Sequence, residues 1–270
     1  MRIDLHLHST ASDGSLTPGV LVRTAAGAGL DIIALTDHDT VAGVDEASSA
    51  AAGAVHVIHA IEMSATHDAG ELHVLGYFID ASHPALIAYS GEAVRARRTR
   101  MHGMLKRLER LGVRVEYEEV AAAAGPDGAA IGRPHLARAL VQRGYVQSFA
   151  DAFDRYIGDR APAFLPTELL SARAAIELIH TTGGVAVWAH PRASLFHREI
   201  RRFAGWGLDG VECFRPRSAP EECLAFETTT RALGMLVTGG SDWHGEWHGR
   251  LGEFSMSRDE VGAFLARGGI

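Results

Sequence analysis

The chain begins MRIDLHLHSTASDGS (residues 1–15), and the histidines in this stretch decide how the rest of the sequence is interpreted. From Ile3 to His8, apolar and polar residues alternate with a period of two, which is typical of a β-strand. In such a strand His6 and His8 point to the same face. Two adjacent imidazoles are either part of a solvated surface or half of a metal site, because histidine is the commonest metal ligand. The chain has 15 histidines, so their positions decide between these interpretations.

The composition is that of an ordinary globular enzyme, with 47% hydrophobic and 22% charged residues among 270. This length is enough for one large α/β domain, with or without an insertion. The net charge of −7 argues against a surface that coats nucleic acid. Cys213 and Cys223 form no paired framework, and we see neither a leader pattern nor an apolar stretch of membrane-spanning length. We therefore expect a cytoplasmic protein that binds no membrane and has no stable protein partner.

Strand and helix signals alternate at both ends of the chain and give way to a basic helical stretch between them. Short apolar strands are predicted at 2–9, 31–39, 55–65, 71–79, 185–191, 208–214 and 235–244. The third and fourth of these should pair as a hairpin, and Thr17 followed by Pro18 is typical of a helix start. The pattern predicts an α/β barrel-like domain formed by 1–83 and 166–270, interrupted by a helical insertion at 84–165.

Imidazole and carboxylate side chains recur where the predicted strands end. They are His6, His8, Asp13, Asp37, His38, Asp39, Glu62, His73, His190, Asp242 and His244. The C-terminal ends of strands are where α/β barrels and open α/β sheets build active sites. Each motif alone is more typical of a turn or a solvated face. Glu62 is more informative, because an unpaired carboxylate in an apolar strand is costly to bury. The recurrence of such residues at nearly every strand favours a metal site.

These motifs resemble, in order and over nearly the whole chain, those of the polymerase and histidinol phosphatase (PHP) family. The matching segments are DLHLHSTASDGS (4–15), LTDHDT (35–40), Glu62 followed by His73, WAHP (188–191) and GGSDWHG (239–245). The resemblance implies a distorted (β/α)7 barrel and up to three divalent metals. Manganese is the first expectation, with iron and zinc as alternatives, and nitrogen and oxygen ligands without thiolate fit all three.

Carried over residue by residue, the resemblance implies three sets of metal ligands. They are His6, His8, Glu62 and Asp242; then Glu62 as a bridge with His73 and His190; then Asp13, His38 and His244. All nine positions hold a residue that can bind metal, which favours an active enzyme. Asp37 and Asp39 are expected to orient His38 rather than to bind metal themselves.

A site of this kind predicts hydrolysis of a phosphoester. Metals a few ångströms apart activate water and neutralise phosphoryl oxygens, and the sequence has no GxxxxGK[ST] loop that would bind phosphate instead. We expect a metal-bound hydroxide to attack phosphorus, with a catalytic set of Asp13, His38, His190 and His244. His190, His244 or a metal-bound water could carry the proton, and the sequence does not rank them.

The basic insertion is expected to select the substrate. Its candidate substrate contacts are Arg97, Arg100, His102, Arg133 and His135. Arg97 and Arg100 lie three residues apart and share a helix face, so together with His102 they could point into the barrel mouth. Arg133 and His135 flank a proline at a predicted helix start, which is a favourable place to bind an anion. The alternative for Arg133 is an ion pair with an acidic neighbour such as Asp127.

GRPHLARAL (132–140), FDRYIG (153–158) and the basic helix resemble the insertion of one PHP subgroup. That subgroup contains 3′,5′-nucleoside bisphosphate phosphatases and 5′–3′ exoribonucleases. The resemblance implies a nucleotide substrate with two phosphates, and adenosine 3′,5′-bisphosphate cut to AMP and phosphate is the leading candidate. Three alternatives stay open: an exoribonuclease acting on short RNA, a histidinol-phosphate phosphatase, and a non-catalytic metal-binding module.

Overall fold

The computed structural model describes residues 1–68, 70–124, 130–167 and 170–270, and these residues form one seven-stranded sheet in the order of the chain. The strands are β1 (Ile3–Leu7), β2 (Ile32–Leu35), β3 (His56–His67), β4 (Gly70–Tyr77), β5 (Val185–Trp188), β6 (Gly210–Phe214) and β7 (Leu236–Gly239). Neighbouring strands run parallel except around β4, which is antiparallel to both β3 and β5. The predicted hairpin is therefore confirmed as the β3–β4 pair.

The sheet curls into a half-barrel whose two edges approach each other beyond the end of β7. The backbone N–H of His8 donates to the carbonyl oxygen of Trp243 at 3.0 Å, and the N–H of Trp243 donates to that of His6 at 3.3 Å. Leu7 and Trp243 thereby form an isolated parallel bridge. This contact confirms the prediction of a distorted seven-stranded barrel. It also brings the loop that carries Asp242 against the strand that carries His6.

The first strand departs from the simple alternation that its sequence predicts. Its register with β2 shifts between Asp4 and Leu7. Ile3 and Leu5 pack in one hydrophobic cluster with residues of β2 to β5 and α10, whereas Leu7 packs in another beside α1 and α2. An irregularity of this kind re-aims the side chains that follow it. His6 and His8 nevertheless both reach the carboxylate of Glu62.

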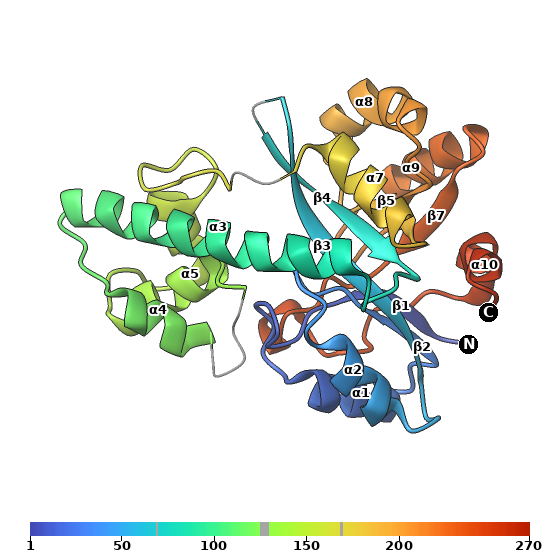
Figure 1. Ribbon diagram of the computed structural model, residues 1–270, viewed down its shortest axis with the longest axis horizontal. Helices are drawn as coiled ribbons and strands as arrows, with labels where there is room; N and C mark the ends of the chain where they lie inside the picture. Colours follow the sequence, from blue (N-terminus) through green and yellow to red (C-terminus); the bar gives the residue numbers. More distant parts are fainter. Residues whose placement is uncertain (69, 125–129, 168–169) are drawn as a thin grey trace.

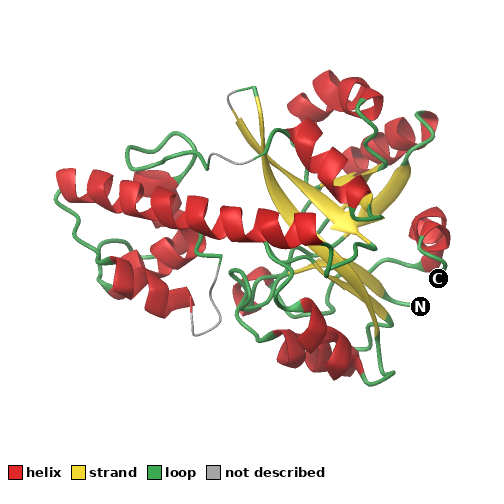
Figure 2. Cartoon of the chain, in the orientation of Figure 1, coloured by secondary structure: helices red, strands yellow, loops and turns green. Residues whose placement is uncertain are grey.

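Helices cover the outside of the curled sheet, as Figures 1 and 2 show. They are α1 (Pro18–Gly27), α2 (Val44–Ala51), α7 (Ala172–Thr181), α8 (Ala193–Gly205), α9 (Pro220–Ala232) and α10 (Arg258–Arg267), with a short 3₁₀ turn, η2, at Glu246–His248. The predicted start of α1 is confirmed, because the hydroxyl of Thr17 accepts from the backbone N–H of Val20 and Pro18 occupies the first turn.

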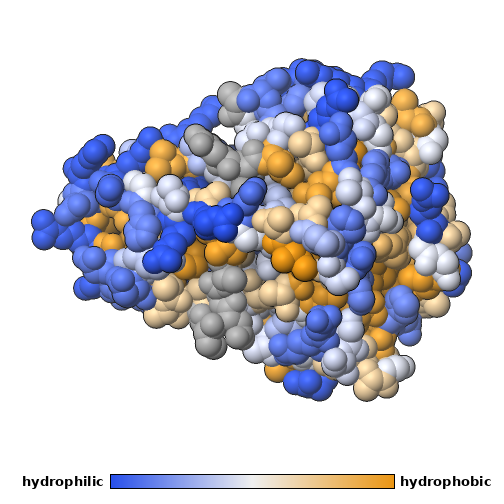
Figure 3. Space-filling view, viewed as in Figure 1, coloured by the Kyte–Doolittle hydropathy of each residue, from blue (hydrophilic) through white to orange (hydrophobic). Residues whose placement is uncertain are grey.

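A group of helices from the middle of the chain extends to one side of the sheet (Figure 1). It comprises α3 (Pro84–Arg110), α4 (Tyr117–Ala124), α5 (Arg133–Gln142), α6 (Phe149–Ala152) and a π-helical turn, η1 (Phe153–Ile157). We call the described residues of 84–165 the helical lobe. Buried side chains such as Met104, Leu108, Leu136 and Leu140 give it a hydrophobic cluster of its own. In the view of Figure 3, its outer end is covered mainly by hydrophilic side chains.

Among the described residues, no helix is both long enough and apolar enough to cross a lipid bilayer. The longest, α3, has 27 residues. Its first eight residues are uncharged, but charged residues recur from Glu92 to Arg110.

The contact between the β7 loop and β1 depends on a residue without a side chain. A Cβ atom on Gly240 would lie 2.6 Å from the backbone nitrogen of His6 and 2.2 Å from its Cβ. We expect Gly240→Ala to lower the free energy of unfolding by about 1–3 kcal/mol, because backbone atoms must move apart. Urea denaturation followed by circular dichroism measures this change.

The matched control is Gly91→Ala on α3, where the nearest atom to an added Cβ lies at an ordinary 3.7 Å. Alanine in a helix interior is favoured over glycine, so this variant should gain about 0.5–1 kcal/mol. Equal stability of Gly240→Ala and the wild type would contradict the proposed closeness of β1 and the β7 loop.

Candidate metal centre

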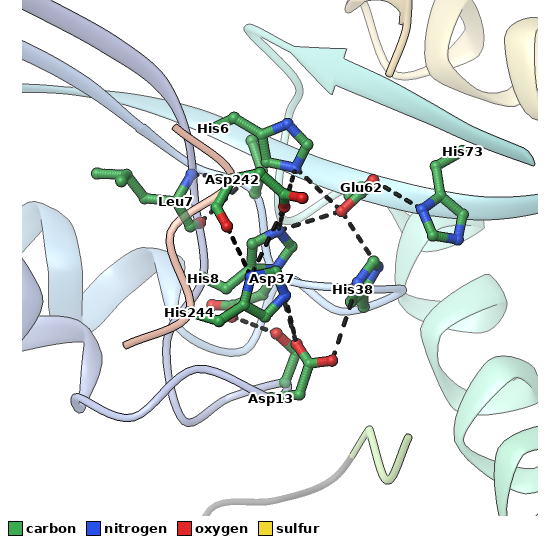
Figure 4. A network of polar contacts seen from close by, with 12 residues as sticks. His6, Leu7, His8, Asp13, Asp37, His38, Glu62, His73, Asp242 and His244 are labelled. Atoms are coloured by element: carbon green, nitrogen blue, oxygen red, sulfur yellow. Dashed lines mark hydrogen bonds and ion pairs between the residues drawn. The ribbon is translucent and has the colours of Figure 1, made fainter. Parts of the chain in front are cut away.

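The side chains predicted to bind metal converge at one end of the half-barrel. Figure 4 labels all of them except His190. They come from β1 or the loop after it, the loop after β2, the hairpin strands, and the loops after β5 and β7. In order, they are His6, His8, Asp13, His38, Glu62, His73, His190, Asp242 and His244. Gly14 makes the first loop possible, because a Cβ there would lie 2.2 Å from the carbonyl oxygen of His8. The tight turn returns Asp13 to within 3.8 Å of the His8 ring.

Glu62 lies at the centre of this convergence and is fully buried. One of its oxygens, Oε2, lies 3.1 Å from Nε2 of His6 and 3.1 Å from Nε2 of His8. Asp242 completes this group, with Oδ1 at 3.2 Å and 3.3 Å from the same two nitrogens. These four residues offer ligand atoms that all lie within 4.8 Å of one another. They are the first of the three sets expected from the sequence.

The other oxygen of Glu62, Oε1, faces the hairpin side. It lies 2.9 Å from Nδ1 of His73 and 2.9 Å from Nε2 of His190, so the second expected set also comes together. His38 approaches the same carboxylate, with Nδ1 at 3.2 Å from Oε2. The compact group that the structure forms here is His38, Glu62 and His73. His38 thus stands between two groups, which the sequence had not indicated.

The third expected set gathers around the carboxylate of Asp13. Oδ1 of Asp13 is 3.3 Å from Nε2 of His244, and its Oδ2 is 3.9 Å from Nε2 of His38. His8 belongs to this group as well, and its ring stacks on that of His244 with centroids 4.0 Å apart. His8 therefore belongs to two neighbouring groups of candidate ligands.

The chemistry of these side chains fits divalent metal ions. Both ring nitrogens of His8, Nδ1 of His38 and Oδ1 of Asp13 are buried and have no hydrogen-bond partner among the described residues. Leaving such groups unsatisfied is costly, and a bound cation would satisfy them. The donors are nitrogen and oxygen without sulfur, the set that suits manganese, iron or zinc.

The electrostatics of the site depend on burial and on the mixture of acids and imidazoles. Burial opposes ionisation of Glu62, but the surrounding histidines outweigh it and hold the pKa of this carboxyl well below its usual value. Burial also opposes ionisation of Asp13, but His244 and His38 outweigh it and lower the pKa of this carboxyl. Both acids are therefore anionic at neutral pH and ready to bind a cation.

The histidines divide into two kinds. Burial lowers the pKa of His38 to about 3, so this ring is neutral at pH 7. Burial also acts on His73, but Glu62 and Glu71 together outweigh it and raise its pKa to about 10. For His244, burial is outweighed by Asp13 and Asp242, and the pKa rises to about 9. His73 and His244 therefore carry protons at pH 7 in the metal-free chain.

Two of these residues adopt a backbone conformation that is rare outside glycine. His190 has φ of 28° and Asp242 has φ of 53°. Such strained residues persist where the surrounding structure holds them, and they cluster at functional sites. At His190 the support is Glu212, whose Oε2 accepts from the backbone N–H at 2.7 Å.

Glu212 is a site residue that the sequence analysis missed. Its other oxygen, Oε1, lies 2.8 Å from Nδ1 of His6, so this buried carboxylate orients one ligand and fixes the backbone of another. The sequence pattern could have identified it, because Glu212 is a lone carboxylate in the apolar strand VECF (211–214), just as Glu62 is in the strand at 55–65. Asp37 does not orient His38 as expected, because its oxygens accept from the backbone N–H and hydroxyl of Ser9 and from the hydroxyl of Ser12 instead.

A cavity of about 350 Å³ opens above the candidate metal ligands, within the range of small-molecule sites. Its walls combine the candidate ligands with basic and aromatic side chains, namely Arg97, Arg100, Arg133, Phe149, Phe153 and Trp247. Arg97 is buried and forms an ion pair with Asp39, and also binds the hydroxyl of Ser64 at 2.9 Å. Asp39 therefore holds Arg97 rather than His38.

Of the predicted substrate contacts, Arg100 and Arg133 also line this cavity. Arg100 donates to the carbonyl oxygen of Leu165 at 2.7 Å and lies 3.6 Å from Glu71. Arg133 is paired with Asp159 at 2.7 Å. The alternative partner, Asp127, lies outside the described residues.

His102 and His135, the two histidines predicted to contact substrate, are not among the residues that line this cavity. His135 is buried at the start of α5, where its Nδ1 accepts from the backbone N–H of Gly132 at 3.0 Å, and burial lowers its pKa to about 4. The expectation that His102 faces the barrel mouth is wrong. It is exposed and stacks on Tyr117 beside a separate cavity of the helical lobe, because its position on α3 points away from the sheet.

Comparison with known proteins agrees with this geometry. A family model for the PHP domain matches residues 4–157, more than half of the chain. A 5′–3′ exoribonuclease of Haemophilus influenzae is 36% identical over 251 residues, which are 90% of each chain. A 3′,5′-nucleoside bisphosphate phosphatase of Chromobacterium violaceum is 31% identical over 262 residues, covering 92% of this chain and 89% of that protein.

A solved structure from Bifidobacterium adolescentis, provisionally named as a metal-dependent phosphoesterase, is similar over 98% of this chain and 96% of its own. The TM-score is 0.88 and the sequence identity is 32%. The family match, the relatives and the convergent imidazole and carboxylate groups lead to one conclusion. The chain belongs to the PHP family and is a metal-dependent phosphoesterase.

Proposed function

We propose that this enzyme removes the 3′-phosphate from nucleoside 3′,5′-bisphosphates, with adenosine 3′,5′-bisphosphate (pAp) as the leading substrate. The observation that carries the proposal is the composition of one cavity. Its floor holds the candidate metal ligands, and its walls hold three arginines and three aromatic rings. A nucleotide with two phosphates offers a matching set of groups: one phosphate for the metals, one for an arginine, and a base for the rings.

We propose that Arg133 binds the 5′-phosphate. It lies in the first turn of α5, where free backbone N–H groups favour an anion. Its guanidinium also lies over the rings of Phe153 and Phe164, at 5.6 Å and 5.2 Å from their centroids, which holds it in place. Its pairing with Asp159 leaves the other donors of the guanidinium fork for a phosphate.

The aromatic wall supports a role in binding the base. Phe149 of α6 and Trp247 of η2 stack with centroids 5.8 Å apart, so the helical lobe and the barrel meet at the cavity. A base can stack on such rings with little dependence on its identity. We therefore propose that residues 84–165 form an insertion that caps the substrate, with residues 1–83 and 166–270 as the metal-binding barrel.

We propose three divalent metals per chain, with manganese first and iron or zinc as alternatives. The residues that would hold them are His6, His8, Asp13, His38, Glu62, His73, His190, Asp242 and His244. Bound metals would activate a water and neutralise the phosphoryl oxygens. The chain's own residues set the geometry. Glu212 lies 2.8 Å from Nδ1 of His6 and would accept the proton of that nitrogen, which would leave Nε2 of the ring to bind a metal.

The proton for the departing 3′ oxygen would come from a water held by the metals, because His190 and His244, which both line the cavity, would bind metal through deprotonated ring nitrogens. Asp13 lies 3.3 Å from Nε2 of His244 and orients that ring, and His38, neutral at pH 7, completes the proposed catalytic set. General acids of this kind act when they lie within hydrogen-bond reach of the atom that receives the proton.

A second candidate is the stepwise trimming of short RNA from its 5′ end. One observation favours it: a second cavity adjoins the first at His190 and Asp242 and leads away from the helical lobe. The bond broken would be the same, between phosphorus and a 3′ oxygen. The two substrates differ only in whether a further nucleotide is attached to that phosphate.

The first test compares four substrates with the manganese-loaded enzyme: pAp, AMP, histidinol phosphate and a short 5′-phosphorylated RNA. We expect rapid phosphate release from pAp with AMP as the remaining product, because AMP has no 3′ ester to break. Faster release of mononucleotides from RNA would favour the exoribonuclease. No turnover of any of the four with metals bound would reject both candidates and leave a metal-binding module.

Arg133→Gln tests the proposed contact with the 5′-phosphate. A hydrogen bond to a charged group contributes about 1.5–3 kcal/mol, so KM for pAp should rise about 10-fold or more while kcat changes little. Arg143→Gln is the matched control, since Arg143 follows the end of the same helix and pairs with Glu119. An unchanged KM for Arg133→Gln would remove this residue from the binding site.

The pKa values predict that metal binding releases protons. His73 and His244, with pKa values of about 10 and about 9, are protonated at pH 7 and must lose a proton to bind a cation. We expect at least two protons released per chain at pH 7, and a metal affinity that increases as the pH rises toward 9. Titration calorimetry in two buffers of different ionisation enthalpy measures this number.

His73→Gln should reduce the number of protons released by about one, whereas His59→Gln, an exposed ring bonded to Ser48, should not change it. A binding heat that is independent of the buffer would contradict the prediction.

A further inference from the structure

A second cavity, of about 190 Å³, adjoins the metal-binding residues away from the helical lobe. It shares His190, Asp242 and His248 with the main cavity. Its other walls come from the loop after β6 and the loop after β7, namely Arg215, Pro216, Arg217, Ser218 and Ser241. The main cavity thus continues past the metal-binding residues into a space with two arginines.

Two polar groups of this second cavity lack hydrogen-bond partners among the described residues. Arg215 is mostly buried, with 18% of its side chain exposed. Its Nε has no hydrogen-bond partner among the described residues, and neither has the buried hydroxyl of Ser241. The remaining contacts of Arg215 are long: 3.4 Å to the carbonyl oxygen of Pro191 and 3.9 Å to Glu222. A buried cation with so few partners is costly, and an anion in the cavity would offset that cost.

Arg217 adds a second positive charge at the exposed edge of the same cavity. Its guanidinium donates to the carbonyl oxygen of His248 at 3.4 Å, which directs the side chain across the opening. Asp242 is the one carboxylate among the residues that line the cavity, and it belongs to the proposed metal ligands. With metals bound, its charge would be compensated, and the field of the cavity would be positive.

We propose that Arg215, Arg217 and Ser241 bind the phosphate that follows the scissile phosphate in an oligonucleotide, and so determine activity on short RNA. This inference rests on the proposed phosphoesterase function. Water adds its oxygen to phosphorus, the bond to the 3′ oxygen breaks, and that oxygen takes a proton. The phosphate remains on the 5′ oxygen of the next nucleotide, which lies beyond the metals and away from Arg133.

The position of the cavity agrees with this path. The nucleotide that leaves occupies the main cavity under the helical lobe, between Arg133 and the metals. The downstream nucleotide must then extend from the metals in another direction. The second cavity opens directly beside His190 and Asp242 and carries the positive charge that the next phosphate requires. The substrate pAp has no group to place there.

The test compares three substrates: pAp, the 5′-phosphorylated dinucleotide pApA, and pApAp, which adds a phosphate to the 3′ end of pApA. We expect the wild-type kcat/KM for pApAp to exceed that for pApA by about 10-fold or more. Arg215→Ala should abolish this difference and leave pAp hydrolysis unchanged. Arg173→Ala is the control, since it removes an exposed arginine of α7 that pairs with Glu177.

Arg217→Ala gives an independent variant at an exposed position, for the case that Arg215→Ala does not fold; it should reduce the preference for pApAp. Binding of pApAp to the metal-free protein, measured by calorimetry, should weaken in both variants. A wild type that hydrolyses pApA and pApAp equally would overturn the subsite, and so would a variant that loses pAp and pApAp activity together. If none of the three substrates is hydrolysed, the proposed function is rejected. In that case the binding measurement still tests the subsite, and unchanged binding of pApAp in the variants would reject it.

Discussion

The site depends on a single buried carboxylate. Glu62 has no exposed surface, and five imidazoles, those of His6, His8, His38, His73 and His190, lie within 3.2 Å of its oxygens. An isolated anion at this depth would be strongly unfavourable, so its burial is possible only because positive or polar groups surround it. The histidines in turn are positioned by strands that pack around β3. The candidate metal ligands and the core of the barrel are therefore held in place by the same packing.

The curl of the sheet brings the ligands from opposite ends of the chain together. Asp242 and His244 are more than 230 residues from His6 and His8, yet backbone hydrogen bonds between the β7 loop and β1 place them in contact. Gly240 permits this approach because any side chain there would meet His6. Glu212 then couples the two sides, since one carboxylate orients the His6 ring and supports the strained backbone of His190.

The helical lobe supplies the arginines of the main cavity. The barrel presents imidazoles and carboxylates, whereas the lobe brings Arg97, Arg100 and Arg133 to the same cavity. Each of these arginines is already paired: Asp39 holds Arg97, Glu71 and Leu165 hold Arg100, and Asp159 holds Arg133. Carboxylates on barrel and lobe thus fix the direction of each guanidinium before any substrate binds, and a fixed direction reduces the entropy lost on binding.

The sequence by itself determined the family, the alternation of strands and helices and the nine candidate metal ligands, because these depend on local period and on motifs that stand at strand ends. It did not predict the register shift in β1, the role of Glu212, the partner of Asp39 or the outward position of His102. Those depend on which side chains meet across distant segments. Burial, charge pairing and the close approach of β1 to the β7 loop are properties of the packed chain, and only the tertiary structure decides them.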